Sequence, residues 1–159
     1  MWEDGHILSV KILLTLISPR RTGPTGPAAE LLQLYIDRAA RYNPCTFSVF
    51  PSEAKLLEFV ADTTSRTRPA LLLADSRGKQ LSSEELATTI GSLQDTGIQQ
   101  LILAIGPADG WSSAALAAAS RTIAFGRITL PHELAAVVGA EQLYRALTIR
   151  AGHPYHSGH

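Results

Sequence analysis

The sequence lacks several features that would each point to a class of protein. A single cysteine, Cys45, cannot form an internal disulfide, and such sparse use of cysteine fits a reducing compartment. No stretch approaches the ~18 consecutive apolar residues of a membrane span. The apolar stretch at residues 6–17 has neither the basic start nor the small-residue cleavage site of a signal peptide. We therefore expect a cytoplasmic protein that does not cross a membrane.

An excess of charge of one sign is also missing. Lys and Arg total 14, Asp and Glu total 14, and the formal net charge is zero. This balance argues against strong non-specific binding to naked nucleic acid, but it leaves open an RNA recognised by shape or within a larger particle.

Good evidence for a metal site is missing as well. His153, His156 and His159 recur every three residues, but no acidic residue or cysteine lies near them. Pro154 prevents the regular helix that would stack their rings. We expect no metal here, and we interpret Cys45 as a small half-buried residue beside a strand rather than a reactive thiol.

Apolar and amphipathic segments alternate along the chain. Its length fits one domain, which we place at residues 10–159 after an N-terminal extension at residues 1–9. The pattern predicts strands at residues 10–17, 46–50, 70–74, 100–105 and 122–128, with a polar turn at 75–79. It predicts helices at residues 28–42, 52–62, 83–96, 112–120 and 133–150. Strands and helices at this spacing indicate an α/β fold, a parallel sheet with helices on both faces.

Ligands of such sheets bind beyond the carboxyl ends of the strands. This rule gathers Ala74, the loop at residues 106–110 and the segment at residues 125–132 at one edge. The loop reads GPADG, and its glycines would let the backbone approach a ligand closely. It is neither a GxGxxG motif nor a phosphate-binding P-loop. Taken alone, it is consistent with a ligand loop or with a plain tight turn.

The last predicted helix and its tail carry the polar residues of most interest. His132, in the first turn, suits a neutral base or a donor to a phosphate, and equally a capping or surface residue. Arg145 lies in an apolar stripe and needs a partner, which is either Glu141 four residues earlier or a phosphate. Tyr155, between two histidines, is typical of a base-stacking or docking residue.

Several motifs occur in order in this part of the chain. They are Leu130-Pro131-His132, the LYRA stretch at residues 143–146, the HPYH stretch at residues 153–156, and DSRGK followed by SSEE at residues 75–79 and 82–85. The set resembles the RlmH family, the pseudouridine N3-methyltransferases of large-subunit ribosomal RNA in the SPOUT superfamily. The resemblance implies a parallel-sheet SPOUT-type α/β knot, a single domain with a deep carboxyl-terminal trefoil knot.

The resemblance also implies the chemistry. The cofactor would be S-adenosylmethionine, and the substrate would be a pseudouridine in 23S ribosomal RNA on assembled ribosomes. The enzyme would be a homodimer in which the tail of one subunit completes the site of the other. The implied cofactor contacts are Ala74, Gly106, Phe125, Gly126, Arg127, Ile128, Thr129 and Leu130. The implied catalytic residues, which would hold the RNA or take the N3 proton, are His132, Arg145, His153, Tyr155 and His156.

Several positions depart from the family pattern, among them the shorter acidic residue Asp109 and the segment at residues 18–21, which replaces a glycine-lysine loop. Pro107 stands where a second glycine is usual and Ala74 where leucine is usual. These departures favour an alternative, a catalytically inactive SPOUT-fold module that binds RNA or a nucleotide.

Overall fold

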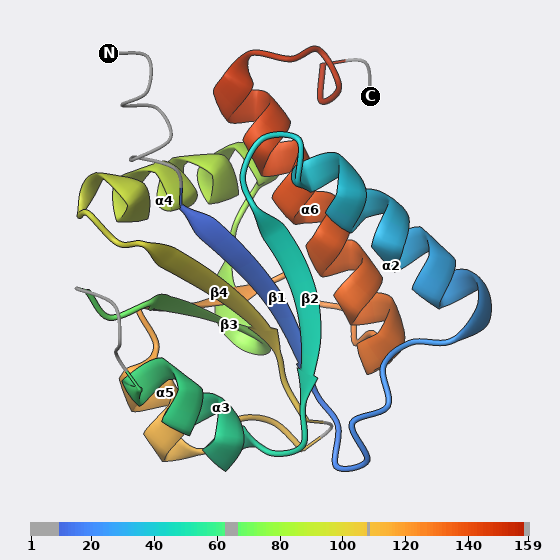
Figure 1. Ribbon diagram of the computed structural model, residues 1–159, viewed down its shortest axis with the longest axis vertical. Coiled ribbons are helices and arrows are strands. Elements are labelled where there is room, and N and C mark those ends of the chain that lie inside the picture. Colours follow the sequence, from blue (N-terminus) through green and yellow to red (C-terminus); the bar gives the residue numbers. More distant parts are fainter. Residues whose placement is uncertain (1–9, 63–66, 108, 158–159) are drawn as a thin grey trace.

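A sheet of five parallel strands organises the chain (Figure 1), with the strand order β2-β1-β4-β3-β5. The computed structural model describes residues 10–62, 67–107 and 109–157, so the predicted extension lies outside the described residues. The strands are β1 (Lys11–Ile17), β2 (Cys45–Phe50), β3 (Ala70–Gln80), β4 (Gln100–Ile105) and β5 (Arg121–Ala124). The helices are α2 (Gly26–Ala39), α3 (Glu53–Ala61), α4 (Ser83–Asp95), α5 (Ser113–Ala118) and α6 (His132–Ala151).

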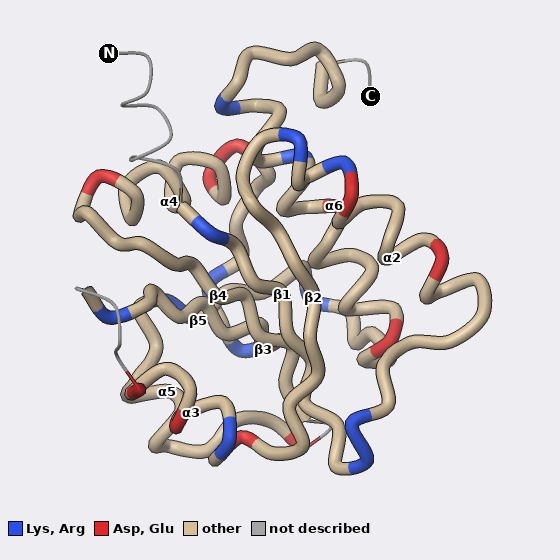
Figure 2. Tube along the Cα trace, in the orientation of Figure 1, with Lys and Arg blue, Asp and Glu red and all other residues tan. Residues whose placement is uncertain are grey.

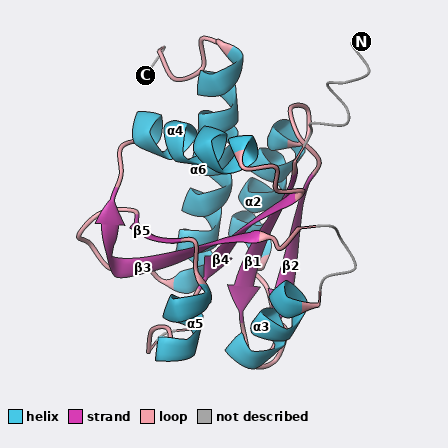
Figure 3. Cartoon of the chain, turned by 90° about the vertical axis from the view of Figure 1, so that its left-hand side faces the viewer, coloured by secondary structure: helices cyan, strands magenta, loops and turns pink. Residues whose placement is uncertain are grey.

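Helices cover both faces of the sheet, which explains why its central strands are apolar throughout. Figure 3 shows α2, α4 and α6 on one face and α3 and α5 on the other. Alternate residues of β1 and β4 enter two separate cores, because successive side chains of a strand point to opposite faces. The predicted α/β fold with a parallel sheet is confirmed.

Helix α6 follows the edge strand β5 yet packs against β1 and β4 in the middle of the sheet, and against α2 and α4. Residues 125–131 therefore carry the chain from the sheet edge back past β3. On that path they meet the loop that follows β4, and the two segments line one cavity. This return crossing is the feature of the fold that builds the site.

The predicted polar turn at residues 75–79 is wrong. Strand β3 continues to Gln80, with an irregularity at which both Ala74 and Lys79 pair with Ile123 of β5. Gly78 allows this, because a Cβ there would lie 2.7 Å from the backbone nitrogen of Ile123. The prediction failed because a glycine-containing polar run is also the composition of a bulge.

The last predicted strand, residues 122–128, was too long. Strand β5 ends at Ala124, and the residues that follow line the cavity instead of pairing. Ser52 caps α3, and Ser82 forms a reciprocal capping box with Glu85 at the start of α4.

Charges of both signs are interspersed over the chain rather than separated onto different faces (Figure 2). Within the described ranges, no helix has both the length and the apolar character needed to cross a membrane.

Candidate active site

A cavity of about 360 Å³ lies at the carboxyl ends of β4 and β5, beside the bulge in the middle of β3. Its walls come from the β3 bulge, the loop after β4, the crossing segment after β5 and the first turn of α6. The lining residues are Ala74, Asp75, Ser76, Arg77, Ile105, Gly106, Pro107, Asp109, Gly110, Trp111, Phe125, Gly126, Ile128, Thr129, Leu130, His132 and Ala135. The cavity thus lies at the sheet edge where the sequence predicted a ligand site.

Seven of the eight residues predicted to contact a cofactor line this cavity. They are Ala74, Gly106, Phe125, Gly126, Ile128, Thr129 and Leu130. Arg127, the eighth, is exposed and is not among the lining residues. His132 lines the cavity too, as the first residue of α6. Pro131 occupies the N-cap position, so His132 does not have the capping role that the sequence left open.

Trp111 is a cavity residue that the sequence analysis missed. Its indole Nε1–H donates a 2.9 Å hydrogen bond to the backbone carbonyl of Ala74, and its side chain is buried. Gly106 makes room for the ring, since a Cβ there would lie 2.6 Å from the Trp111 Cε2. A tryptophan directly after a glycine-flanked loop was the available signal.

Asp75 and Arg77, in the β3 bulge, were also missed as site residues. The Asp75 carboxylate accepts hydrogen bonds from the Arg77 Nε and Nη2 at 3.1 and 2.8 Å, and from the Arg77 backbone N–H at 2.8 Å. The hydrogen bonds from the Arg77 guanidinium lower the pKa of Asp75 below its ordinary value. A charged pair is therefore built into one wall of the cavity.

Two glycines let the backbone turn into the cavity. Gly110 has φ +88° and Gly126 has φ +135°, in a region that other residues rarely adopt. Pro107 does not prevent the tight turn in the first loop, because its carbonyl accepts the N–H of Gly110 at 3.0 Å.

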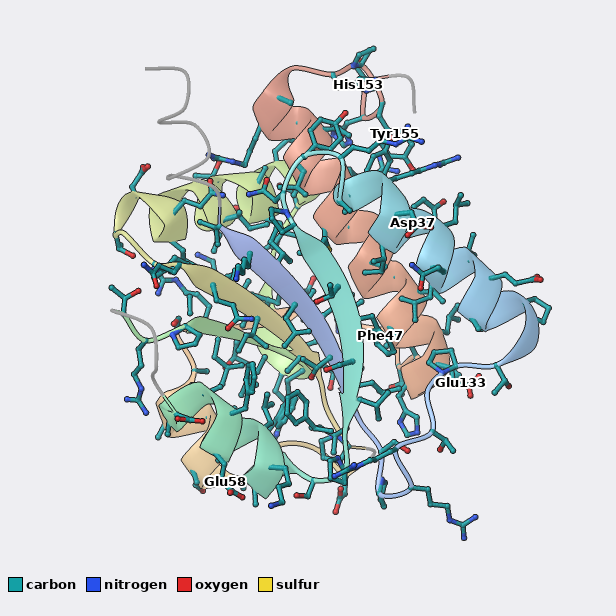
Figure 4. All side chains as sticks on the ribbon, in the orientation of Figure 1. Asp37, Phe47, Glu58, Glu133, His153 and Tyr155 are labelled. Carbon is teal, nitrogen blue, oxygen red and sulfur yellow. The ribbon has the colours of Figure 1, made fainter. Side chains whose placement is uncertain are left out.

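The tail residues lie at the other end of α6. Between His132 and Arg145 the helix advances 13 residues, which at 1.5 Å per residue is about 20 Å. Figure 4 shows His153 and Tyr155 near one end of α6 and Glu133, next to His132, at the other. Within one chain, therefore, the residues predicted to be catalytic form two separate groups.

Glu141 organises the second group. It accepts hydrogen bonds from the Arg145 Nε and Nη2 at 3.1 and 2.7 Å and from the Tyr155 hydroxyl at 2.8 Å. Burial opposes ionisation of Glu141, but the hydrogen bonds from Arg145 and Tyr155 outweigh it and lower its pKa. Of the two partners that the sequence left open for Arg145, the chain itself supplies the carboxylate.

Tyr155 is packed as well as hydrogen-bonded. The Tyr155 ring centroid lies 4.6 Å from the Tyr144 ring centroid. The guanidinium carbon of Arg145 lies 4.8 Å from the Tyr155 ring centroid. Burial, with the hydrogen bond to Glu141, raises the pKa of Tyr155. Its hydroxyl is a hydrogen-bond donor in this arrangement rather than a base.

His156 bridges α6 and α4. Its Nδ1 lies 2.9 Å from the Arg145 Nη1, and its Nε2 lies 3.1 Å from a carboxylate oxygen of Glu84. An arginine can only donate, so Nδ1 is the acceptor and Nε2 carries the hydrogen that faces Glu84. His153 is exposed, and its Nδ1 accepts the backbone N–H of Tyr155 at 3.1 Å. These contacts hold the tail in one conformation.

Cys45 is buried at the start of β2, and burial raises the pKa of its thiol to about 12. It is a core residue rather than a reactive one. Over residues 10–62, 67–107 and 109–157, no three His, Cys, Asp or Glu side chains are grouped so as to hold a metal ion.

Comparison with known proteins identifies the family. The family model described as "Predicted SPOUT methyltransferase" matches residues 17–156. A ribosomal RNA large subunit methyltransferase H from Koribacter versatilis is 50% identical over 125 residues, covering 79% of this chain and 85% of the relative. The protein of the same name from Chelativorans sp. is 42% identical over 144 residues, covering 82% and 83%. The chain belongs to the RlmH family of SPOUT methyltransferases.

Solved structures agree on the fold. A probable methyltransferase from Bordetella pertussis matches with a TM-score of 0.54 at 16% identity, over 92% of this chain and 99% of that one. A probable methylase family protein from Haemophilus influenzae matches with a TM-score of 0.54 at 12% identity, over 92% and 68%. As a member of the RlmH family, the chain is an RNA methyltransferase.

Proposed function

We propose that this RlmH-family protein transfers a methyl group from S-adenosylmethionine to N3 of a pseudouridine in 23S ribosomal RNA, on assembled ribosomes in the cytoplasm. The observation that carries the proposal is the cavity at the carboxyl edge of the sheet. It brings together seven of the eight residues expected to contact the cofactor, and His132. The names of the relatives, ribosomal RNA large subunit methyltransferases, support the choice of substrate.

The cavity fits the cofactor in size and character. Its volume of about 360 Å³ lies within the usual range for small-molecule sites. Phe125 and Leu130 provide apolar surface, and the glycines at 106, 110 and 126 expose backbone groups that can bind an adenine ring. When bound, the cofactor supplies a methyl group already activated by its sulfonium. The protein must then mainly align the reacting atoms and exclude water.

The target nitrogen carries a proton that must leave. Among the lining residues, Asp75 is already engaged by Arg77, whereas His132 offers an imidazole at the cavity wall. We assign His132 the role of accepting this proton or orienting the ring that loses it.

The tail points to a homodimer. Arg145 lies about 20 Å along α6 from His132, and Tyr155 and His156 are held beside Arg145 and Glu141 in a defined arrangement. We propose that the tail of a second copy completes the cavity of the first and holds the RNA there. Exposed apolar side chains support a covered surface beside the cavity, since Ile128 is 73% and Leu134 47% exposed.

We further propose that the crossing segment is threaded as a deep trefoil knot. Helix α6 packs against β1 and β4 although it follows β5, so residues 125–131 must return across the end of β3 next to the loop after β4. A chain that crosses itself at this point has the geometry that such threading requires.

Two measurements test the function. Calorimetry with S-adenosylmethionine should show binding, and mass spectrometry of rRNA from treated ribosomes should show one added methyl group on a pseudouridine. A folded protein that binds no cofactor would instead support the inactive module that Pro107 and Ala74 suggested.

The shared site can be tested by complementation. Gly106→Leu displaces Trp111 and so disrupts the cavity, Tyr155→Ala disrupts the tail, and each variant alone should be inactive. When the two are co-expressed, mixed dimers keep one intact cavity facing one intact tail. Random pairing would then restore roughly a quarter of the wild-type activity. No recovery would show that cavity and tail do not act across a dimer.

A further inference from the structure

Arg77 is held in a fixed orientation at the rim of the cavity. Its guanidinium donates through Nε and Nη2 to the two carboxylate oxygens of Asp75, at 3.1 and 2.8 Å. The Asp75 side chain is 4% exposed, whereas that of Arg77 is 67% exposed. The carboxylate is thus buried in the wall while the guanidinium faces solvent at the cavity mouth.

The backbone is irregular at the positions that place this pair. The β3 bulge displaces Asp75 and Arg77 from the ladder, and Gly78 lets the bulge close against β5. Across the cavity mouth, a Cβ at Gly110 would lie 3.2 Å from the Arg77 Nη2. The loop after β4 therefore approaches the guanidinium through a glycine.

Stability does not account for the arrangement. An ion pair with an exposed partner contributes little to folding, and burying its carboxylate carries a desolvation cost. A guanidinium has five N–H donors, and Asp75 engages only part of them. Among the described residues, no partner engages the Arg77 Nη1. A donor edge is therefore left facing the cavity mouth.

We propose that Arg77 binds a phosphate of the substrate RNA next to the nucleotide in the cavity, with Asp75 as its positioning residue. This rests on the proposed function, because the partner is the RNA of that same site. A planar guanidinium matches two phosphate oxygens, and prior fixation by Asp75 lowers the entropy cost of the contact. A chain with zero net charge and interspersed charges (Figure 2) must hold RNA through individually placed cations.

The methyl donor also carries an anionic group, its carboxylate, which Arg77 could bind instead of an RNA phosphate. Substitution of Arg77 distinguishes the two ligands. Arg77→Gln should leave the Kd for S-adenosylmethionine within about twofold of wild type while raising the KM for ribosomes about tenfold, the loss of one charge-assisted hydrogen bond. The dependence of ribosome binding on salt should become less steep by about one charge. Arg77→Lys should be intermediate. Arg121→Gln, which removes a charge at the amino end of β5, is the matched control and should behave as wild type.

Asp75→Asn separates orientation from charge. The substitution removes a negative charge and makes the rim of the cavity more positive. If Arg77 acts only through its charge, the KM for ribosomes should fall. If Asp75 is needed to orient Arg77, the KM for ribosomes should rise. The phosphate proposal is overturned if Arg77→Gln leaves ribosome affinity unchanged, or if it weakens S-adenosylmethionine binding instead.

Sedimentation with ribosomes keeps the two proposals distinct. If the wild-type protein binds ribosomes without methylating them and Arg77→Gln weakens that binding, the phosphate contact stands and the proposed catalysis fails. If the wild-type protein methylates ribosomes and Arg77→Gln does so equally well, the proposed catalysis stands and the phosphate contact fails.

Discussion

The indole Nε1–H of Trp111 and the backbone carbonyl of Ala74 are joined by a 2.9 Å hydrogen bond across 37 residues of sequence. This bond connects the loop after β4 to the middle of β3, so it fixes two walls of the cavity relative to each other. The ring packs so closely over Gly106 that no side chain fits there.

Gly106→Ala should therefore displace Trp111 and weaken cofactor binding. The added Cβ would lie 2.6 Å from the indole, so the ring must move and its hydrogen bond to Ala74 must break. We expect a loss of about 1–3 kcal/mol in the free energy of unfolding and a weaker Kd for S-adenosylmethionine. In a Trp111→Phe background the smaller ring should tolerate the alanine better. Chemical denaturation should measure the loss of unfolding free energy that Gly106→Ala causes in the wild-type and in the Trp111→Phe protein. An equal loss in the two would contradict this account.

Glu141→Gln should release the tail. The neutral amide cannot form the charged pair with Arg145, and it weakens the hydrogen bond from Tyr155. We expect a loss of about 2 kcal/mol in the free energy of unfolding, and a larger fractional loss of ribosome methylation. Arg145→Lys, which keeps the charge but not the forked geometry, should be milder. Unchanged stability of Glu141→Gln in urea denaturation would show that the cluster does not hold the tail.

Asp75→Asn should destabilise the protein only slightly at neutral pH, because the Arg77 partner is exposed, and not at all in strong acid. Arg77 lowers the pKa of Asp75 in the folded protein, so the pair stabilises the fold above the ordinary carboxyl pKa. That contribution is lost as the pH falls below 3.8, through the lower folded value. Denaturation of wild type and variant at pH 7 and near pH 2 provides the check. If wild type and variant differ in unfolding free energy by the same amount at both pH values, the charged pair is not the source of the difference.

Cys45 should report unfolding. It is the only cysteine in the sequence, it is buried, and burial raises the pKa of its thiol to about 12. Ellman's reagent at pH 8 should therefore react slowly with the native protein and label one thiol per chain in guanidinium chloride. Rapid labelling of the native protein would show that the start of β2 opens readily.

The part of the fold that the sequence predicted is the part governed by local pattern. Strands buried on both faces must be continuously apolar, as β1 and β4 are, and the rule for parallel sheets then placed the cavity. Trp111 and Asp75 were missed because their roles depend on contacts that no spacing reveals. For Trp111 the contact is with a residue on another strand, and for Asp75 it is burial by a bulge that resembles a turn in composition.

The separation of His132 from the tail was not visible in the motifs either. The LPH, LYRA and HPYH elements follow one another closely in sequence, but the first and the last are separated by one continuous helix of 20 residues. Proximity along the chain is therefore a poor guide to which motif residues share a site when a long helix joins them.

The length of helix α6 fixes the distance and the rotation between His132 at its start and the tail that follows its end. One residue inserted between Glu141 and Leu143 would lengthen it by only about 1.5 Å but would rotate everything beyond by about 100°. Glu141 and Tyr155 would then no longer meet on the same side, or the cavity end would have to turn instead. The number of residues between Pro131 and Gly152 is thus fixed by geometry as firmly as the identity of any side chain in the cavity.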